Sequence, residues 1–416
     1  MASPRGAPDQ GDSDVVTYRE FNGLRNDVDT ERFEAADLAV ATNCDIDASG
    51  RLARRAGYTS RIVGARHSLW ADEHINLALV VSGTQLRRIN ADYSESVLGS
   101  GLTTGARMSY TRVNDRVYFS NGYQSGVVEN GVVRGWGLPV PALPAVAVTV
   151  GGMPAGAYQY VMTYLRADGQ ESGAGVAGKI DVPAGGGVRF TLPVSASSDV
   201  SSKAVYISMP NGEILYRATI VANSVVTYTY SGDATGLVTP LLTQFKGPPP
   251  AGQLVGYFRG HLFSAAGDLL YPSDPFSYEL FDLRRFVQLD GRITLFAPFE
   301  DTGRAEQGRN SGVFIGTDRS CGVLVGSDPE RFEYVAKADY GAVLGALDYV
   351  DGDLYGDRTT GAKHIPMWMT TEGICVGMPG MEIKNLTRGR YNVTIGGKGA
   401  ALFQAGPDTF TVVANL

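Results

Sequence analysis

Two proline-rich stretches divide this chain: Gly137-Leu138-Pro139-Val140-Pro141-Ala142-Leu143-Pro144 and Lys246-Gly247-Pro248-Pro249-Pro250-Ala251-Gly252. Proline fixes φ, lacks an N–H donor and restricts the residue before it, so neither stretch can lie inside a helix or a central strand. We therefore expect domain boundaries at both. They predict four segments: a flexible N-terminal arm (1–16), the first part of a body (17–138), an insert (139–245) and the second part of the body (246–416).

The insert has the pattern of a self-contained β-sandwich. Tyr158, Tyr160 and Tyr164 share one face by a period of two, and Asn211-Gly212 is a strong hairpin signal between two apolar runs. Seven short strands without a cysteine pair favour the fibronectin type III or immunoglobulin-like fold. The predicted strands lie near residues 145–150, 157–165, 176–182, 187–192, 203–209, 213–220 and 224–230.

The body repeats a strand, a turn at Gly or Asp, and a second strand. Leu254–Phe258 turns at Arg259-Gly260 into His261–Ala266, and Pro366–Met369 turns at Glu372-Gly373 in the same way. Radial stacking of four-stranded units protects the strand edges of a β-propeller. We therefore predict an all-β chain whose propeller-like body has about five or six blades. Two unrelated β-sandwiches would use the same local signals and remain an alternative.

One short helix is expected near the N-terminus. Asp29 or Thr30 stands where a residue could cap a helix that runs toward Ala39, with Glu31 in its first turn.

Composition excludes several classes of protein. A net charge of -7 and a pI near 5.3 argue against a general nucleic-acid binder, which needs a basic face. The three cysteines are far apart and odd in number, which is typical of a reducing compartment. The polar N-terminus does not resemble a signal peptide, and no stretch has the length of an apolar membrane span.

Two acidic stretches resemble cation loops, and the sequence favours an ordinary turn for the first and a solvated loop for the second. Asp45-Ile46-Asp47-Ala48-Ser49-Gly50 opens like a calcium loop, but Ala56 stands where a bidentate glutamate should close it. The second stretch has four aspartates among glycines: Asp348, Asp351, Asp353 and Asp357.

Other catalytic signals are weak. The four histidines lack metal-ligand spacing: His67, His74, His261 and His364. Gly185-Gly186-Gly187 precedes a strand, which favours a hairpin turn over a phosphate-binding loop. We therefore predict no catalytic, cofactor-binding or metal-binding residue, no cofactor and no enzyme activity.

Several segments of the body share a family pattern: Phe21-Asn22-Gly23-Leu24, Glu31-Arg32-Phe33, Ala39–Asp47, Gly50–Tyr58, Tyr257–Phe263, Leu270–Pro275, Glu279–Asp282, Trp368–Ile374 and Asn385–Thr387. Together they resemble the tail nozzle proteins (tail hub, or tail tubular protein B-like) of short-tailed bacteriophages. The resemblance covers roughly 17–138 and 246–416.

The resemblance implies a structural virion protein, assembled in the host bacterial cytoplasm without stable membrane insertion. It implies a homo-oligomer, a sixfold ring beneath the portal adaptor (head–tail connector) ring at the portal vertex. Genomic DNA would pass through the channel during ejection without sequence-specific binding, and tail fibres or a tail needle would dock outside it.

The negative net charge of the chain agrees with this role, because an acidic channel wall would let DNA pass without binding it. Two alternatives remain: another head–tail connector, tail-tube or baseplate component, and, from a different class, a carbohydrate-binding or glycan-cleaving β-propeller.

Overall fold

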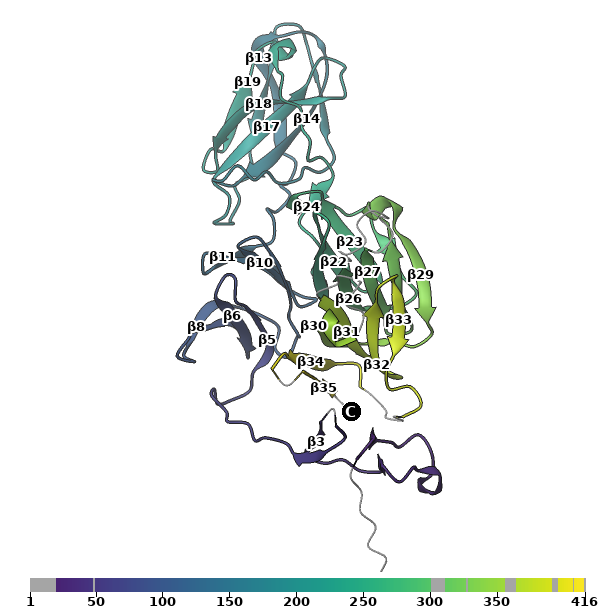
Figure 1. Ribbon diagram of the computed structural model, residues 1–416. Coiled ribbons are helices and arrows are strands. Elements are labelled where there is room, and N and C mark those ends of the chain that lie inside the picture. Colours follow the sequence, from purple (N-terminus) through teal and green to yellow (C-terminus); the bar gives the residue numbers. More distant parts are fainter. Residues whose placement is uncertain are drawn as a thin grey trace, which may run out of the picture.

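The computed structural model describes residues 20–47, 49–300, 311–326, 328–355, 364–390, 396–406 and 408–414, so the predicted arm at 1–16 lies outside the described residues. In these ranges the regular structure consists of strands and one-turn 3-10 helices, and no α-helix occurs. The chain is all-β, as predicted. Figure 1 shows the insert at one end of the molecule and residues 20–66 at the opposite end.

The body contains five antiparallel sheets in which consecutive strands are neighbours. The first two comprise β5 (His67–Asp72), β6 (Leu77–Ser82), β7 (Gln85–Ile89) and β8 (Glu95–Ser100), then β9 (Ser109–Val113), β10 (Arg116–Ser120), β11 (Ser125–Glu129) and β12 (Val132–Gly135). The third comprises β21 (Leu254–Phe258), β22 (His261–Ala266), β23 (Leu269–Asp274) and β24 (Ser277–Asp282), extended by β20 (Lys246–Gly247) and β25 (Val287–Gln288).

The fourth and fifth sheets follow the same plan. They comprise β26 (Ile293–Phe299), β27 (Gly312–Thr317), β28 (Cys321–Val325) and β29 (Glu333–Ala338), then β30 (Ala342–Asp351), β31 (His364–Thr370), β32 (Gly373–Met378) and β33 (Glu382–Asn385). A two-stranded sheet ends the chain: β34 (Gly399–Gln404) and β35 (Thr409–Ala414). The short 3-10 helices η4 (Pro329–Arg331) and η5 (Gly352–Tyr355) lie in loops of these sheets.

The sheets stack in chain order like propeller blades, because each pair of neighbours shares a core. Phe119 of the second sheet packs with Leu79 of the first, and Tyr118 on its other face packs with Phe281 of the third. Phe263 and Ile315 join the third and fourth sheets, and Phe314 and Trp368 join the fourth and fifth. Strands β9, β21, β26, β30 and β34 contact one another in sequence. Two separate sandwiches would not give this stacking, so the body is propeller-like.

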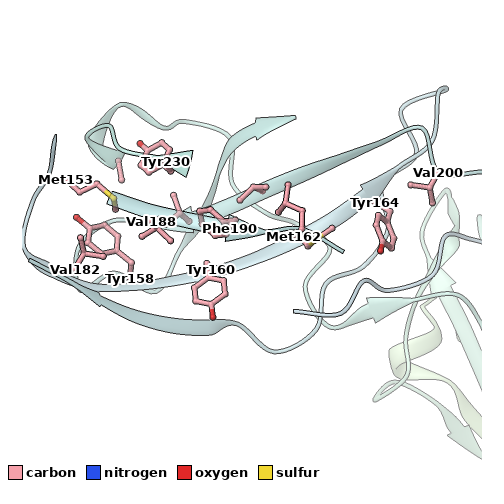
Figure 2. Packing of buried hydrophobic residues seen from close by; sticks show 14 of the residues in the cluster. Met153, Tyr158, Tyr160, Met162, Tyr164, Val182, Val188, Phe190, Val200 and Tyr230 are labelled. Atoms are coloured by element: carbon pink, nitrogen blue, oxygen red, sulfur yellow. The ribbon is translucent and has the colours of Figure 1, made fainter. Parts of the chain in front are cut away.

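The insert is a seven-stranded sandwich with a single closed core between its sheets (Figure 2). Its strands are β13 (Ala145–Met153), β14 (Gly156–Leu165), β15 (Gly178–Val182), β16 (Gly186–Thr191), β17 (Ser202–Ser208), β18 (Leu215–Ala222) and β19 (Thr227–Tyr230), followed by η2 (Ala234–Gly236). One sheet has the order β13-β16-β19 and the other β15-β14-β17-β18. The first, fourth and seventh strands thus share a sheet, whereas the constant-type immunoglobulin domain places its first, second, fourth and fifth strands together.

The two turn predictions in the insert differ in outcome. Asn211, with φ +54°, lies in the hairpin that joins β17 to β18, as predicted. Gly185 has φ +74° in a turn between β15 and β16, which belong to different sheets. The glycine run is therefore a turn from one sheet to the other and not a hairpin.

The helix expected at 29–39 does not form. Only η1 (Thr30–Arg32) is helical, a single 3-10 turn, and the Asp29 side chain makes no capping hydrogen bond. Short helices are marginal unless one face packs on a core, and this segment has no core beneath it. The surrounding elements are β1 (Gly23–Leu24), β2 (Asp37–Leu38), β3 (Cys44–Ile46) and β4 (Leu52–Arg54).

Candidate functional site

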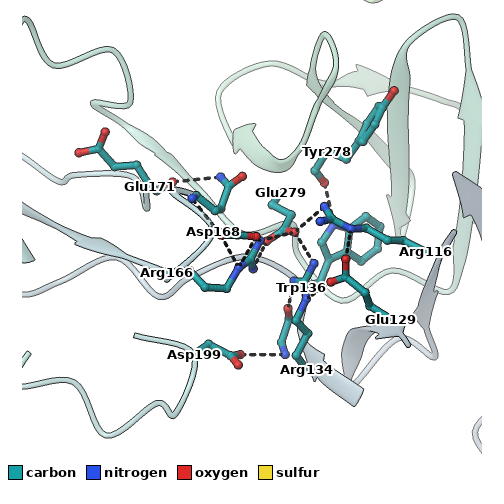
Figure 3. A network of polar contacts seen from close by, with 12 residues as sticks. Arg116, Glu129, Arg134, Trp136, Arg166, Asp168, Glu171, Asp199, Tyr278 and Glu279 are labelled. Atoms are coloured by element: carbon teal, nitrogen blue, oxygen red, sulfur yellow. Dashed lines mark hydrogen bonds and ion pairs between the residues drawn. The ribbon is translucent and has the colours of Figure 1, made fainter. Parts of the chain in front are cut away.

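An ionic clamp joins the sandwich to the body, and Glu279 of β24 is its centre (Figure 3). The Glu279 carboxylate accepts hydrogen bonds from Arg134 of β12 at 2.7 Å and from Arg166, after β14, at 2.8 and 3.1 Å. Its side chain is 2% exposed, and each of these arginine side chains is 10% exposed. One carboxylate therefore connects two blades of the body and the insert.

The clamp extends on both sides of Glu279. Glu129 pairs with Arg116 at 2.7 Å and with Arg134 at 3.1 Å, so charges alternate along the network. On the sandwich side, Arg166 also binds Asp168 at 2.9 Å. Although burial alone would lower it, these hydrogen bonds to Glu279 and Asp168 raise the pKa of the Arg166 guanidinium. A buried network of charges is stable only while its members stay paired, so it fixes one orientation of the parts it joins.

Close backbone packing reinforces the clamp. Trp136 donates from Nε1 to the Tyr278 carbonyl at 2.8 Å, and its ring meets Phe281 edge-on. Gly137 has φ +86°, and a Cβ there would lie 2.7 Å from the Glu279 carbonyl oxygen. Only glycine fits this position, so the first proline-rich junction is pressed against β24.

Sequence reasoning missed the clamp. The segment Glu279-Leu280-Phe281-Asp282 stands out in the sequence only by its resemblance to nozzle proteins, and its first acidic residue received no role. A carboxylate inside an otherwise apolar strand is a signal for a buried, paired charge. Its partners lie 113 and 145 residues away in sequence, so they could not be identified from spacing.

A second polar contact joins the early and late parts of the body. Arg107, just before β9, donates to the carbonyls of Gly345 in β30 and Gly399 in β34. Burial lowers the pKa of its guanidinium. Gly345 has φ +81°, and a Cβ there would lie 1.9 Å from the Arg107 Cζ atom. Arg107 thus fastens the second sheet to the last two, across the stack of blades.

A shallow cleft of about 280 Å³ lies between the third and fourth sheets. Its acidic side chains are already engaged, since Asp274 pairs with Lys246 and Asp282 with Arg284 at 2.7 Å. Asp328 accepts the Glu330 N–H at 3.0 Å and caps η4. The arrangement is one of structural ion pairs and turn caps.

The first acidic stretch forms a turn, whereas Asp348 and Asp351 of the second lie in β30 and Asp353 lies in η5. Asp47 accepts from the Ser49 and Arg51 backbone N–H groups at 2.9 and 3.0 Å. Asp348 accepts from the Phe403 N–H at 2.7 Å and so holds β34 to β30. Asp351 caps the Asp353 N–H, and Asp357 lies outside the described residues. In the described ranges, no group of three or more His, Cys, Asp or Glu residues could hold a metal ion.

The histidines lie on separate elements. His67 of β5 contacts Ser68, and burial followed by the charge of Arg107 lowers the pKa of its ring. His261 of β22 contacts the Ser273 carbonyl, His364 begins β31, and His74 lies in the turn after β5.

The cysteines divide by exposure. Cys44 is half-buried, whereas Cys321 and Cys375 are buried, and all three are free thiols. Burial raises the pKa of Cys321 to about 12.

No described helix is long and apolar enough to span a membrane. No protein-family model matches the chain, and no curated protein matches it. Among solved structures, a crystal structure of BBS1N in complex with ARL6DN covers 82% of this chain and 84% of that chain, at 11% identity and a TM-score of 0.30. A TM-score at this level carries no argument, so the fold rests on the strand pairings and shared cores described above.

Proposed function

We propose that this chain is a structural, non-catalytic virion protein that forms the tail nozzle ring of a short-tailed bacteriophage. The ring would be a homo-oligomer, a hexamer by the resemblance, beneath the portal adaptor ring. DNA would leave through its channel, and the sandwich would carry tail fibres or a needle.

The observation that carries the proposal is the clamp. A sandwich with its own core stands at one end of a propeller-like body and is held there by the nearly buried Arg166, which pairs with Glu279 of the body. A docking platform must transmit force without turning, and a paired, buried network gives that fixed orientation. Asp47, Asp328 and Asp348 accept backbone N–H groups and so have structural roles.

The segments that resemble nozzle proteins have structural roles, which also supports the proposal. Trp368 is fully buried between two blades. Asn385 and Thr387 bind the β31–β32 turn, where Thr387 Oγ1 accepts the Ile374 N–H at 2.9 Å. Tyr257–Phe263 forms the hairpin of β21 and β22.

The test is to image intact particles of the phage that encodes this chain, with sixfold averaging at the tail, and to identify the chain by mass spectrometry. We expect a ring beneath the adaptor with one sandwich projecting from each subunit. In particles that carry Glu279→Gln, the ring should persist while density for the sandwich becomes blurred. Absence of the chain from particles would overturn the proposal, and binding on a glycan array would favour the carbohydrate-active propeller.

A further inference from the structure

The sandwich has one sheet edge that no other strand covers, along β13. This strand stands at the end of the sheet β13-β16-β19 and pairs only with β16. Residues 49–300 are described without a gap, and within this range no backbone hydrogen bond outside that pairing involves residues 145–150. Alternate N–H and C=O groups of these residues are therefore free to pair with a further strand.

The side chains along this edge are uncharged, and the apolar layer of the sandwich reaches it. The edge consists of Ala145, Val146, Ala147, Val148, Thr149 and Val150. Val146 packs against the core, whereas Val148 and Val150, which follow it with a period of two, are 47% and 89% exposed. The layer between the two sheets is therefore open at this margin.

Each other edge of the sandwich is protected or short. β15 carries the exposed Lys179 and Asp181, and Pro183 follows it. β18 is covered in part, since the Arg217 N–H donates to the Thr239 carbonyl at 2.8 Å, and β19 has four residues. Proteins protect strand edges with charge, proline or a covering segment, so the unprotected β13 edge is suited to strand addition.

The body follows the same rule of protection. The last strand of each of its four-stranded sheets carries a charged residue: Glu95 in β8, Arg134 in β12, Lys337 in β29 and Lys384 in β33. In the third sheet, β24 is covered by β20. The β13 edge therefore differs from these edges in the same chain.

We propose that the β13 edge binds an extended segment of the tail protein that docks on the sandwich, as a further strand of the sheet β13-β16-β19. The inference rests on the proposed nozzle and names the contact by which its sandwich holds a partner. The segment must be uncharged along the edge, because a charge there would lie against the open apolar layer. Its alternate apolar side chains would contact Val148 and Val150.

A separate tail protein is favoured over a second copy of this chain. Two β13 edges could pair about a two-fold axis, but a contact confined to two short strands buries less than the roughly 1,200 Å² at which stable interfaces begin. A docked tail protein would meet the same edge on every subunit of the ring, so individually weak contacts would add up. β13 is labelled near the tip of the sandwich, away from the body, where such a protein can reach it (Figure 1).

The first test uses the full chain and a soluble peptide of alternating valine and threonine with blocked ends, as long as the 145–150 edge. The fluorescence anisotropy of the labelled peptide measures binding, and hydrogen–deuterium exchange with mass spectrometry locates it. We expect protection of amides in β13 and in no other edge strand of the sandwich. A control peptide with lysine in place of each valine should not bind.

The second test places a charge on the edge. Val150→Lys should weaken peptide binding roughly tenfold and leave urea unfolding unchanged, because Val150 is 89% exposed. The matched control is Val238→Lys, at a valine of the insert that is 83% exposed, and should bind like wild type. Equal binding by both variants, equal binding of the lysine peptide, protection away from β13, or no binding at any peptide concentration would each overturn the inference. Self-association that Val150→Lys abolishes would assign the edge to a second copy and overturn it as well.

Intact particles separate this inference from the nozzle proposal. Val150→Lys should leave the ring and the sandwich in place and remove the docked tail protein, whereas Val238→Lys should retain it. Retention of the docked protein by Val150→Lys particles would overturn the inference and leave the nozzle standing. Absence of the chain from particles would instead defeat the nozzle proposal and leave peptide addition at β13 as a property of the sandwich.

Discussion

The sandwich and residues 20–66 (the strap) belong to one chain, but only the sandwich has a hydrophobic core. The sandwich buries Tyr158, Val188 and Phe190 completely between its two sheets, in a core to which the preceding junction adds only Leu138. Residues 20–66 form strands of only two or three residues and place none of their described residues in a core. Strands occur in both regions, and the presence of a second apolar layer separates an independent domain from a segment without a core.

The largest contrast is expected when the two regions are made separately. A fragment of residues 139–245 should unfold cooperatively in urea and show a structured near-UV circular dichroism spectrum, because its core is closed. A peptide of residues 20–66 should show neither. Phe190→Ala in the fragment should cost about 3–5 kcal/mol. A non-cooperative fragment, or a folded peptide, would break the comparison.

Removing the charge at the centre of the clamp should have the next largest effect. Glu279→Gln removes the buried anion that Arg134 and Arg166 share and leaves them only the more exposed Glu129 and Asp168, which costs about 3–5 kcal/mol. The sandwich should then unfold in a urea transition separate from the body while its own stability stays unchanged. Asp168→Asn is the matched control, since that carboxylate is 46% exposed and its pair contributes ~1 kcal/mol or less. Equal effects of both changes would mean that the clamp does not couple the two parts.

The contact of Arg107 with Gly345 can be tested with a paired glycine. Gly345 and Gly380 have φ of +81° and +83°, but only at Gly345 would a Cβ meet another atom within 4 Å. Gly380→Ala should cost ~1 kcal/mol for the backbone conformation. Gly345→Ala should cost a further ~1–3 kcal/mol by displacing Arg107. Identical losses in thermal unfolding would show that Arg107 adds nothing to closure of the body.

The smallest effect at neutral pH concerns the thiols. Cys44 of the strap should react quickly with a thiol reagent, and Cys321 and Cys375 only on unfolding, so Cys44→Ser should remove the fast phase.

The Cys321 thiol should also make stability depend on pH at alkaline pH. Because burial raises the pKa of Cys321 to about 12 from 9.0, the folded state keeps the thiol proton to a higher pH than the unfolded state does. Its contribution to stability is complete below pH 9 and is lost as the pH rises toward 12. Urea unfolding of wild type and Cys321→Ala across this range measures the difference, and parallel curves would contradict it.

Much of the fold followed from local pattern. Each of the seven strands predicted in the insert overlaps an observed one, because Tyr158, Tyr160 and Tyr164 recur with the period of two that places them on one face of a strand. The helix at 29–39 was wrong because its cap signal is local, whereas a short helix needs a packing face that this segment lacks. The contacts of Glu279 and Arg107 join residues more than a hundred positions apart, and no periodicity encodes such a pairing.

The two proline-rich junctions have one further consequence. A Cβ on Gly137 would lie 3.3 Å from Pro248 Cα, so the chain leaves the body and re-enters it at the same point. A module attached in this way can be removed or replaced as a unit, because the two ends of the body that it joins already lie next to each other. Recombination between related genes could exchange it in one event, and the same spot offers engineers a site at which to graft a different binding domain.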